Sequence, residues 1–109
     1  MGVDNAWEKL YIEIRFALVS NASLQERLGC LISGVSHLQR DSFPDEYVWD
    51  EFRRLMNEAT NRETRHPGDE RIHATTSQMS NEKAKECLQA AFDVFSRVAK
   101  ASGRTEFGI

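Results

Sequence analysis

The sequence contains no apolar run approaching the roughly 20 residues that a membrane-spanning helix needs, so no membrane association is expected. It also lacks an excess of positive charge, because 14 basic and 17 acidic residues give a net charge of −3. Proteins that bind nucleic acid use clustered basic side chains to neutralise phosphates. Nucleic acid is therefore not an expected partner of this chain.

Cysteine is scarce, and its two copies, Cys30 and Cys87, are too far apart to form a metal-binding or redox pair. We therefore expect two free thiols in a reducing, cytoplasmic setting. The sequence also has no glycine-rich phosphate loop, nucleophile elbow or serine-triad signature. It thus predicts no catalytic residue and no cofactor, and it favours a non-enzymatic protein.

The residues that are present describe an ordinary globular domain, with 40% hydrophobic and 28% charged side chains among 109 residues. Apolar residues recur at the 3.6-residue helical period in four segments. These segments are residues 6–19, 24–38, 44–60 and 80–102. The pattern predicts an all-α fold in which residues 1–109 form a single antiparallel four-helix bundle, with 104–109 as a frayed tail.

Several helix ends carry residues with strong positional preferences. Ser23 followed by Glu26 forms a capping-box pattern before the second segment. Asp4 or Asn5 is expected to cap the first segment, because a short side-chain oxygen can accept a bond from an N–H of the first turn. Pro44 suits the first position of the third helix, where no N–H donor is required.

The shared helical period also predicts which residues form the core. This predicted core comprises Leu10, Ile14, Leu18, Leu28, Leu31, Val35, Phe52, Leu55, Leu88, Phe92 and Phe95. Cys87 lies within the apolar arc of the fourth helix and is expected to be buried. Cys30 lies on the flank of the second helix and is expected to react more readily.

Residues 61–79 have no sustained apolar period and include the turn signal Pro67-Gly68. A long polar loop is therefore predicted between the third and fourth helices, although loops of this length are uncommon inside compact domains. Segment 71–77 is rich in β-branched residues, which leaves a second interpretation open. In that alternative the fold is α+β, with a two-stranded ribbon formed by residues 11–19 and 71–77.

The first segment is itself ambiguous, because Ile12, Ile14, Phe16 and Leu18 alternate with polar or small residues as in a strand. We favour a helix, since an isolated two-stranded ribbon is only marginally stable in water. A helix has a consequence for function. Each helical residue is rotated by roughly 100°, which places Ile12, Phe16 and Val19 in one arc on the side opposite Ile14.

A surface helix normally keeps its outer side polar. Monomeric proteins rarely expose a contiguous apolar patch. We therefore expect Ile12, Phe16 and Val19 to bind a protein partner or a second copy of the chain. The alternative is that the long loop or the C-terminal tail covers them within the same chain.

A competing interpretation assigns the function to the long loop. His66, Glu70 and His73 could form an adventitious metal site, because imidazole and carboxylate groups are common ligands. Residues 61–79 would then close as a lid over the pocket of a small ligand-binding protein or enzyme. Di-iron bundles carry the E-x-x-H motif on two helices, whereas this sequence has one copy in a loop, so no metal is predicted.

Overall fold

The computed structural model describes residues 2–61 and 71–103. Its elements are α1 (Val3–Val19), α2 (Leu24–Val35), the 3-10 turn η1 (Arg40–Ser42), α3 (Glu46–Ala59), α4 (Arg71–Thr76) and α5 (Asn81–Ser102). Within these two ranges the chain forms no strand. The predicted all-α class is confirmed. The α+β alternative is wrong, because both segments of the supposed ribbon are helical.

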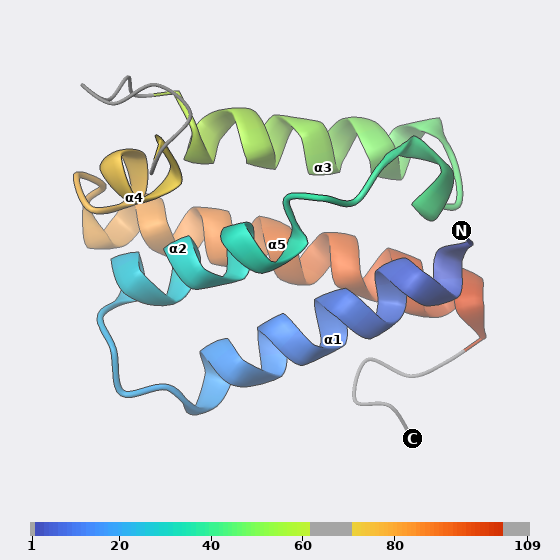
Figure 1. Ribbon diagram of the computed structural model, residues 1–109, viewed down its shortest axis with the longest axis horizontal. Coiled ribbons are helices and arrows are strands. Elements are labelled where there is room, and N and C mark those ends of the chain that lie inside the picture. The colour runs from blue at the N-terminus through green and yellow to red at the C-terminus, as the bar shows by residue number, and fades with distance from the viewer. Residues whose placement is uncertain (1, 62–70, 104–109) are drawn as a thin grey trace.

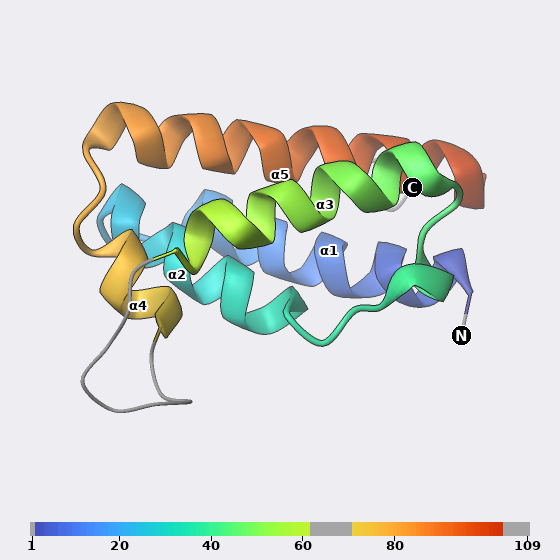
Figure 2. The same cartoon turned by 90° about the horizontal axis from the view of Figure 1, so that it is seen from above.

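The four long helices lie side by side, and each runs in the opposite direction to the long helix before it (Figure 1). α2 and α5 contact each other in the middle, with α1 on one side and α3 on the other (Figures 1 and 2). α1 packs against both α2 and α5, whereas α3 packs mainly against α5. The outer side of α1 therefore faces away from every other long helix.

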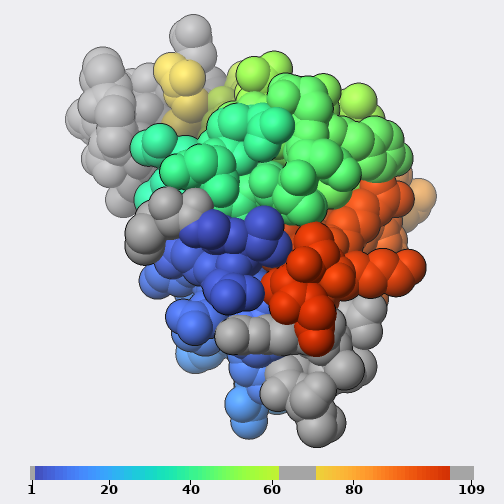
Figure 3. All heavy atoms as spheres, turned by 90° about the vertical axis from the view of Figure 1, so that its right-hand side faces the viewer, coloured from blue at the N-terminus to red at the C-terminus, as the bar shows by residue number. Residues whose placement is uncertain are grey.

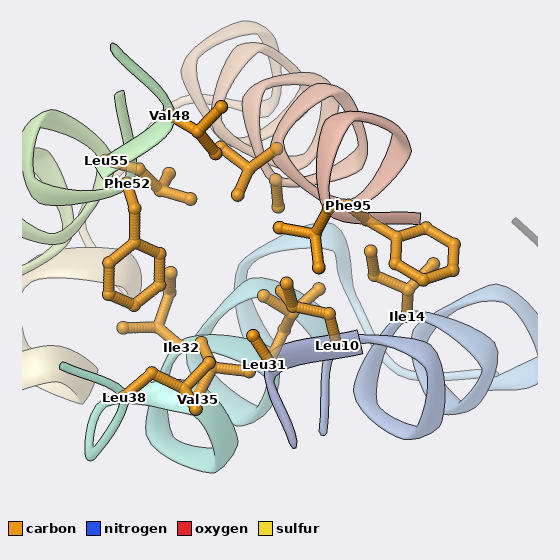
Figure 4. Packing of buried hydrophobic residues seen from close by; sticks show 14 of the residues in the cluster. Leu10, Ile14, Leu31, Ile32, Val35, Leu38, Val48, Phe52, Leu55 and Phe95 are labelled. Carbon is orange, nitrogen blue, oxygen red and sulfur yellow. The ribbon is translucent and has the colours of Figure 1, made fainter. Parts of the chain in front are cut away.

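One hydrophobic cluster joins the long helices, with Leu10, Ile32, Phe52 and Phe95 each contributed by a different one (Figure 4). Most of the predicted core is buried in this cluster: Leu10, Ile14, Leu28, Leu31, Val35, Phe52, Leu55 and Phe95. Leu88 and Phe92 are only partly buried. Burial of this kind stabilises the fold by roughly 1.5–3 kcal/mol for each large side chain.

Leu18 was expected in the core, and this prediction is wrong, since the residue is 65% exposed. The reason is the course of α1, which moves away from α5 as it approaches Val19 (Figure 1). The helical period places Leu18 on the side that faces α5, but α5 is too distant at this end to cover it. Helical periodicity predicts which side of a helix a residue occupies, but it does not predict how far away the neighbouring helix lies.

The expected start of the second helix is present. The Ser23 hydroxyl accepts a hydrogen bond from the backbone N–H of Glu26 at 3.1 Å, as the capping pattern predicts. α5 is capped at its C-terminus by Gly103, whose positive φ of 77° is a backbone conformation that residues other than glycine rarely adopt. Ser80 caps the start of the same helix by accepting from the N–H of Lys83 at 3.0 Å.

Two other caps differ from the prediction. α1 begins at Val3 with Gly2 as its cap, so Asp4 and Asn5 lie inside the first turn and do not cap it. α3 begins one residue after Asp45, whose carboxylate accepts from the N–H of Val48 at 2.9 Å. Pro44 therefore precedes the cap instead of opening the helix. Aspartate is the better cap because its carboxylate accepts a hydrogen bond from an N–H of the first turn, whereas the proline side chain has no acceptor.

The predicted loop 61–79 is wrong over residues 71–76, which form α4. This helix is held by buried threonines, because Thr75 and Thr76 are only 3% and 1% exposed. A Cβ placed on Gly29 of α2 would lie 3.0 Å from the Thr76 hydroxyl, so the missing side chain of Gly29 allows α4 to approach α2 closely. Residues 62–70 and the predicted frayed tail, 104–109, lie outside the described residues.

Candidate functional site

The large apolar side chains at the surface gather on α1. Ile12, Phe16, Leu18 and Val19 are 56%, 64%, 65% and 74% exposed, and we call these four residues the α1 apolar surface. In the described ranges, Tyr47 on α3 is the one other large hydrophobic residue with comparable exposure. Ile12, Phe16 and Val19 thus lie on the outer side of α1, where the sequence places them. Their role in binding stays a prediction.

The inner side of α1 is fixed firmly to the bundle. Ala6, Trp7, Leu10 and Ile14 are buried there. The ring of Trp7 stacks on Tyr11 with centroids 5.1 Å apart, and Tyr11 in turn lies 6.4 Å from the ring of Phe95 on α5. At this end of the bundle the first turns of α1 and the last turns of α5 are in contact (Figure 3). The α1 apolar surface is therefore presented by a well-anchored helix.

A groove of about 420 Å³ adjoins this surface at the other end, where α1 and α5 separate. Its apolar lining includes Ile14 and Leu18 from α1, Leu31 from α2, and Leu88 and Phe92 from α5. The groove explains why Leu88 and Phe92 are only partly buried. Leu18 belongs to both features, so the exposed apolar area continues around the last turn of α1. The charged residues that line the groove are both cationic, Arg27 and Lys85.

Sequence reasoning missed the groove and the exposure of Leu18, although one signal was present. Phe16, Ala17, Leu18 and Val19 are four consecutive apolar residues at the end of α1. Four consecutive helical residues point in all directions around the axis, so a helix that packs on one side must leave some of them exposed. The groove lining could not be found in this way, because it depends on the angle between α1 and α5.

Charged side chains border the α1 apolar surface on both sides. Glu8 and Arg15 are exposed on the side nearer α5, and Lys9 and Glu13 lie on the side nearer α2. The guanidinium of Arg15 donates to the Tyr11 hydroxyl at 3.3 Å and lies 6.0 Å from the centre of its ring. An apolar centre with charged edges is the usual composition of a protein contact surface.

The polar pocket between α3 and α5 has a different character. The Lys83 ammonium binds the Glu58 carboxylate at 2.9 Å, and this hydrogen bond raises the pKa of Lys83. Cys87 lines the same pocket, and burial raises the pKa of its thiol. A protonated thiol is a poor nucleophile. As expected, Cys87 is a buried free thiol and Cys30 an exposed one.

The structure describes one of the three residues of the suggested loop metal site. His73 lies in α4, where its ring faces Gly29 of α2, whereas His66 and Glu70 fall outside the described residues. In residues 2–61 and 71–103, no group of three or more histidine, cysteine, aspartate or glutamate residues is arranged to hold a metal ion. α4 packs on α2 and α3, and it contributes no residue to the lining of the α1–α5 groove. The described part of the proposed lid therefore does not cover that groove.

Over the described ranges, none of the helices is both long enough and apolar enough to cross a bilayer. Comparison with known proteins finds no protein family, no curated protein and no solved structure that matches this chain.

Proposed function

We propose that this protein is a non-enzymatic protein–protein interaction module that binds its partner through the α1 apolar surface. The observation that carries the proposal is the exposure of Ile12, Phe16 and Val19 on the outer side of a single helix, extended by the exposed Leu18 around its last turn. Leaving such a side chain in water forfeits roughly 1.5–3 kcal/mol relative to burial. A partner that covers the surface recovers part of this free energy.

Two further features support binding at this place. The buried side chains of Trp7 and Leu10 and the contact of Tyr11 with Phe95 of α5 hold α1 against the bundle, so little conformational freedom is lost when a partner binds. The α1–α5 groove extends the apolar area beyond Leu18. Specific interfaces bury about 800 Å² on each partner, which is more than a few exposed side chains supply, so this extension matters.

Chemical features of the α3–α5 pocket favour a structural role over catalysis. The Glu58–Lys83 and Glu51–Arg97 ion pairs, at 2.9 and 2.6 Å, join the two helices across it. Cys87 beside them has a raised pKa and stays protonated near neutral pH. These groups stabilise the packing of α3 on α5, and the proposal assigns them no reaction.

The test is site-specific photo-crosslinking in cells that express the protein naturally. A benzophenone amino acid replaces Ile12, Phe16 or Val19 in three separate variants. In a control variant it replaces Asn57, which is exposed on the polar side of α3. We expect a defined protein adduct from position 16 and none from position 57. If positions 12, 16 and 19 all give no adduct, the α1 apolar surface is not a binding site and the proposed function is wrong.

A further inference from the structure

We propose that the partner is a second copy of this chain, with the two α1 helices packed antiparallel about a two-fold axis beside Ile12. The inference rests on the proposed function, and it adds the identity and the register of the partner. It is drawn from the order of the charges along the two edges of the α1 apolar surface. Most closed homo-oligomers are two-fold dimers, whose contact surface must be complementary to itself.

The edge nearer α5 carries a self-complementary pair of charges. Glu8 and Arg15 are both exposed on this edge and lie seven positions apart, which is two helical turns or about 10 Å. A two-fold axis perpendicular to α1 brings the same edge of both copies together and reverses the chain direction. When the axis passes between Tyr11 and Ile12, Glu8 of each copy meets Arg15 of the other. Two ion pairs then flank a contact between the two Ile12 side chains.

The edge nearer α2 also carries a self-complementary pair of charges, in the opposite order. Lys9 and Glu13 lie four positions apart on that edge, and their midpoint is residue 11. The axis positions that follow from the two edges therefore differ by less than one residue, although the edges consist of different side chains. The Glu13 carboxyl lies against Gly34 in this structure, so we assign the main electrostatic contribution to Glu8 and Arg15.

Another antiparallel register brings like charges together. An axis beside Phe16 would centre the pairing on the apolar residues, but it would place the Arg15 guanidinium groups of the two copies side by side. A parallel two-fold pairing would instead bring the Glu8–Arg15 edge of one copy against the Lys9–Glu13 edge of the other, so the double charge reversal described below would weaken it and not restore it. Like-charge contacts across an interface are unfavourable and exclude wrong arrangements. In the proposed register Phe16 lies at the level of residue 7 in the other copy, about 3 Å along the helix axis from Lys9, whose aliphatic stem can extend over the ring.

The size of the contact sets the expected strength of the dimer. α1 has 17 residues and is therefore about 25 Å long. A single pair of such helices buries less than the roughly 800 Å² per partner of a standard interface. We therefore expect a dimer that dissociates in the micromolar range. Association has to be measured across that range, by sedimentation equilibrium of the full chain.

The decisive experiment is a charge swap between the edges of the two copies. Glu8→Arg alone and Arg15→Glu alone each place like charges opposite one another, so each variant should dimerise at least tenfold more weakly than the unchanged protein. An equimolar mixture of the two variants should form a heterodimer, and the double variant should recover the homodimer. Asp50→Arg and Arg54→Glu are matched controls on the exposed side of α3, and both should leave dimerisation unchanged.

Each outcome bears on the inference separately from the proposed function. A protein that stays monomeric throughout overturns the second-copy partner, and a crosslink from position 16 to a protein of different mass would then still support an interaction module. A dimer that survives both single reversals overturns the register. If Arg15→Glu disturbs the fold through its contact with Tyr11, Glu8→Arg carries the test, because Glu8 lies exposed on the helix surface.

Discussion

The carboxyl group of Glu13 on α1 occupies the space that a Cβ at Gly34 on α2 would fill. On α2, Gly29 is approached in the same way by Thr76 and His73 of α4, with separations of 3.0 and 3.1 Å from the position of an added Cβ. The two glycines differ in what approaches them. At Gly34 the neighbour is the far end of a flexible side chain, whereas at Gly29 it includes a buried threonine.

Gly34→Ala should therefore be tolerated. The Glu13 carboxyl can rotate into solvent, and replacing glycine by alanine inside a helix stabilises it by about 1 kcal/mol. We expect the free energy of unfolding, measured by urea denaturation, to stay unchanged or to rise by up to about 1 kcal/mol. A loss of about 2 kcal/mol or more would show that Glu13 cannot leave its place over α2.

Gly29→Ala should be less stable than Gly34→Ala by about 1–2 kcal/mol, because the added methyl group overpacks the contact with Thr76. The comparison cancels the gain in helix propensity, which both variants share. Amide hydrogen exchange should also become faster in residues 71–76 than in α3 or α5. Equal stability of the two variants would mean that α4 shifts away from α2 without cost.

Phe16→Glu should leave the fold intact, because this side chain is 64% exposed. We expect the free energy of unfolding to stay within about 0.5 kcal/mol of the original value. Phe95→Ala is the matched contrast, since Phe95 is 1% exposed and its truncation should cost about 3–5 kcal/mol. Circular dichroism and urea denaturation measure both effects. Unfolding by Phe16→Glu would assign Phe16 to the internal core.

Alkaline pH should destabilise the protein through Cys87. Burial raises the pKa of this thiol above its usual value of 9.0, so the unfolded chain loses the proton at a lower pH than the folded one. The contribution of Cys87 to stability is therefore constant below about pH 9 and is lost as the pH rises toward the folded pKa. Lys83 acts in the same direction. Its raised pKa means that the charged ammonium stabilises the folded state, and this stabilisation is lost when Lys83 is deprotonated. In Cys87→Ala, urea midpoints should fall less steeply above pH 9.

Thiol labelling should separate the two cysteines. Cys30 is exposed and Cys87 is 4% exposed, so a disulfide reagent should modify one thiol quickly in the native protein and the other only on unfolding. Cys30→Ser is the control, and it should abolish the fast phase. Two equally fast phases in the native state would show that α3 and α5 separate readily around Cys87.

The limits of sequence-based prediction are visible in particular residues. Leu10, Leu31 and Phe95 could be assigned to the core because each belongs to a long helix with a clear apolar period. α4 escaped the same reasoning because it has six residues and buries Thr75 and Thr76, which do not stand out as apolar. Its stability comes from a contact with Gly29, far away in the sequence, and local propensity contains no information about that contact.

The candidate site was predictable to the extent that it is a property of one helix. Ile12, Phe16 and Val19 share a side of α1 by helical geometry alone. The α1–α5 groove is a property of two helices and of the angle between them, so its lining by Leu88 and Phe92 became apparent only in three dimensions. The exposure of Leu18 follows from the same angle.

The contact between Tyr11 and Phe95 also has a consequence for the order in which the protein folds. It joins residues from opposite ends of the chain, whereas α1 and α2 are neighbours that can pair as soon as both exist. During synthesis the α5-facing side of α1 therefore stays uncovered until the last helix has left the ribosome. Bringing together residues so far apart in the sequence costs conformational entropy, and this cost slows the docking step. Docking of α5 is thus expected to be the late step of folding, and before it the chain is most prone to aggregate.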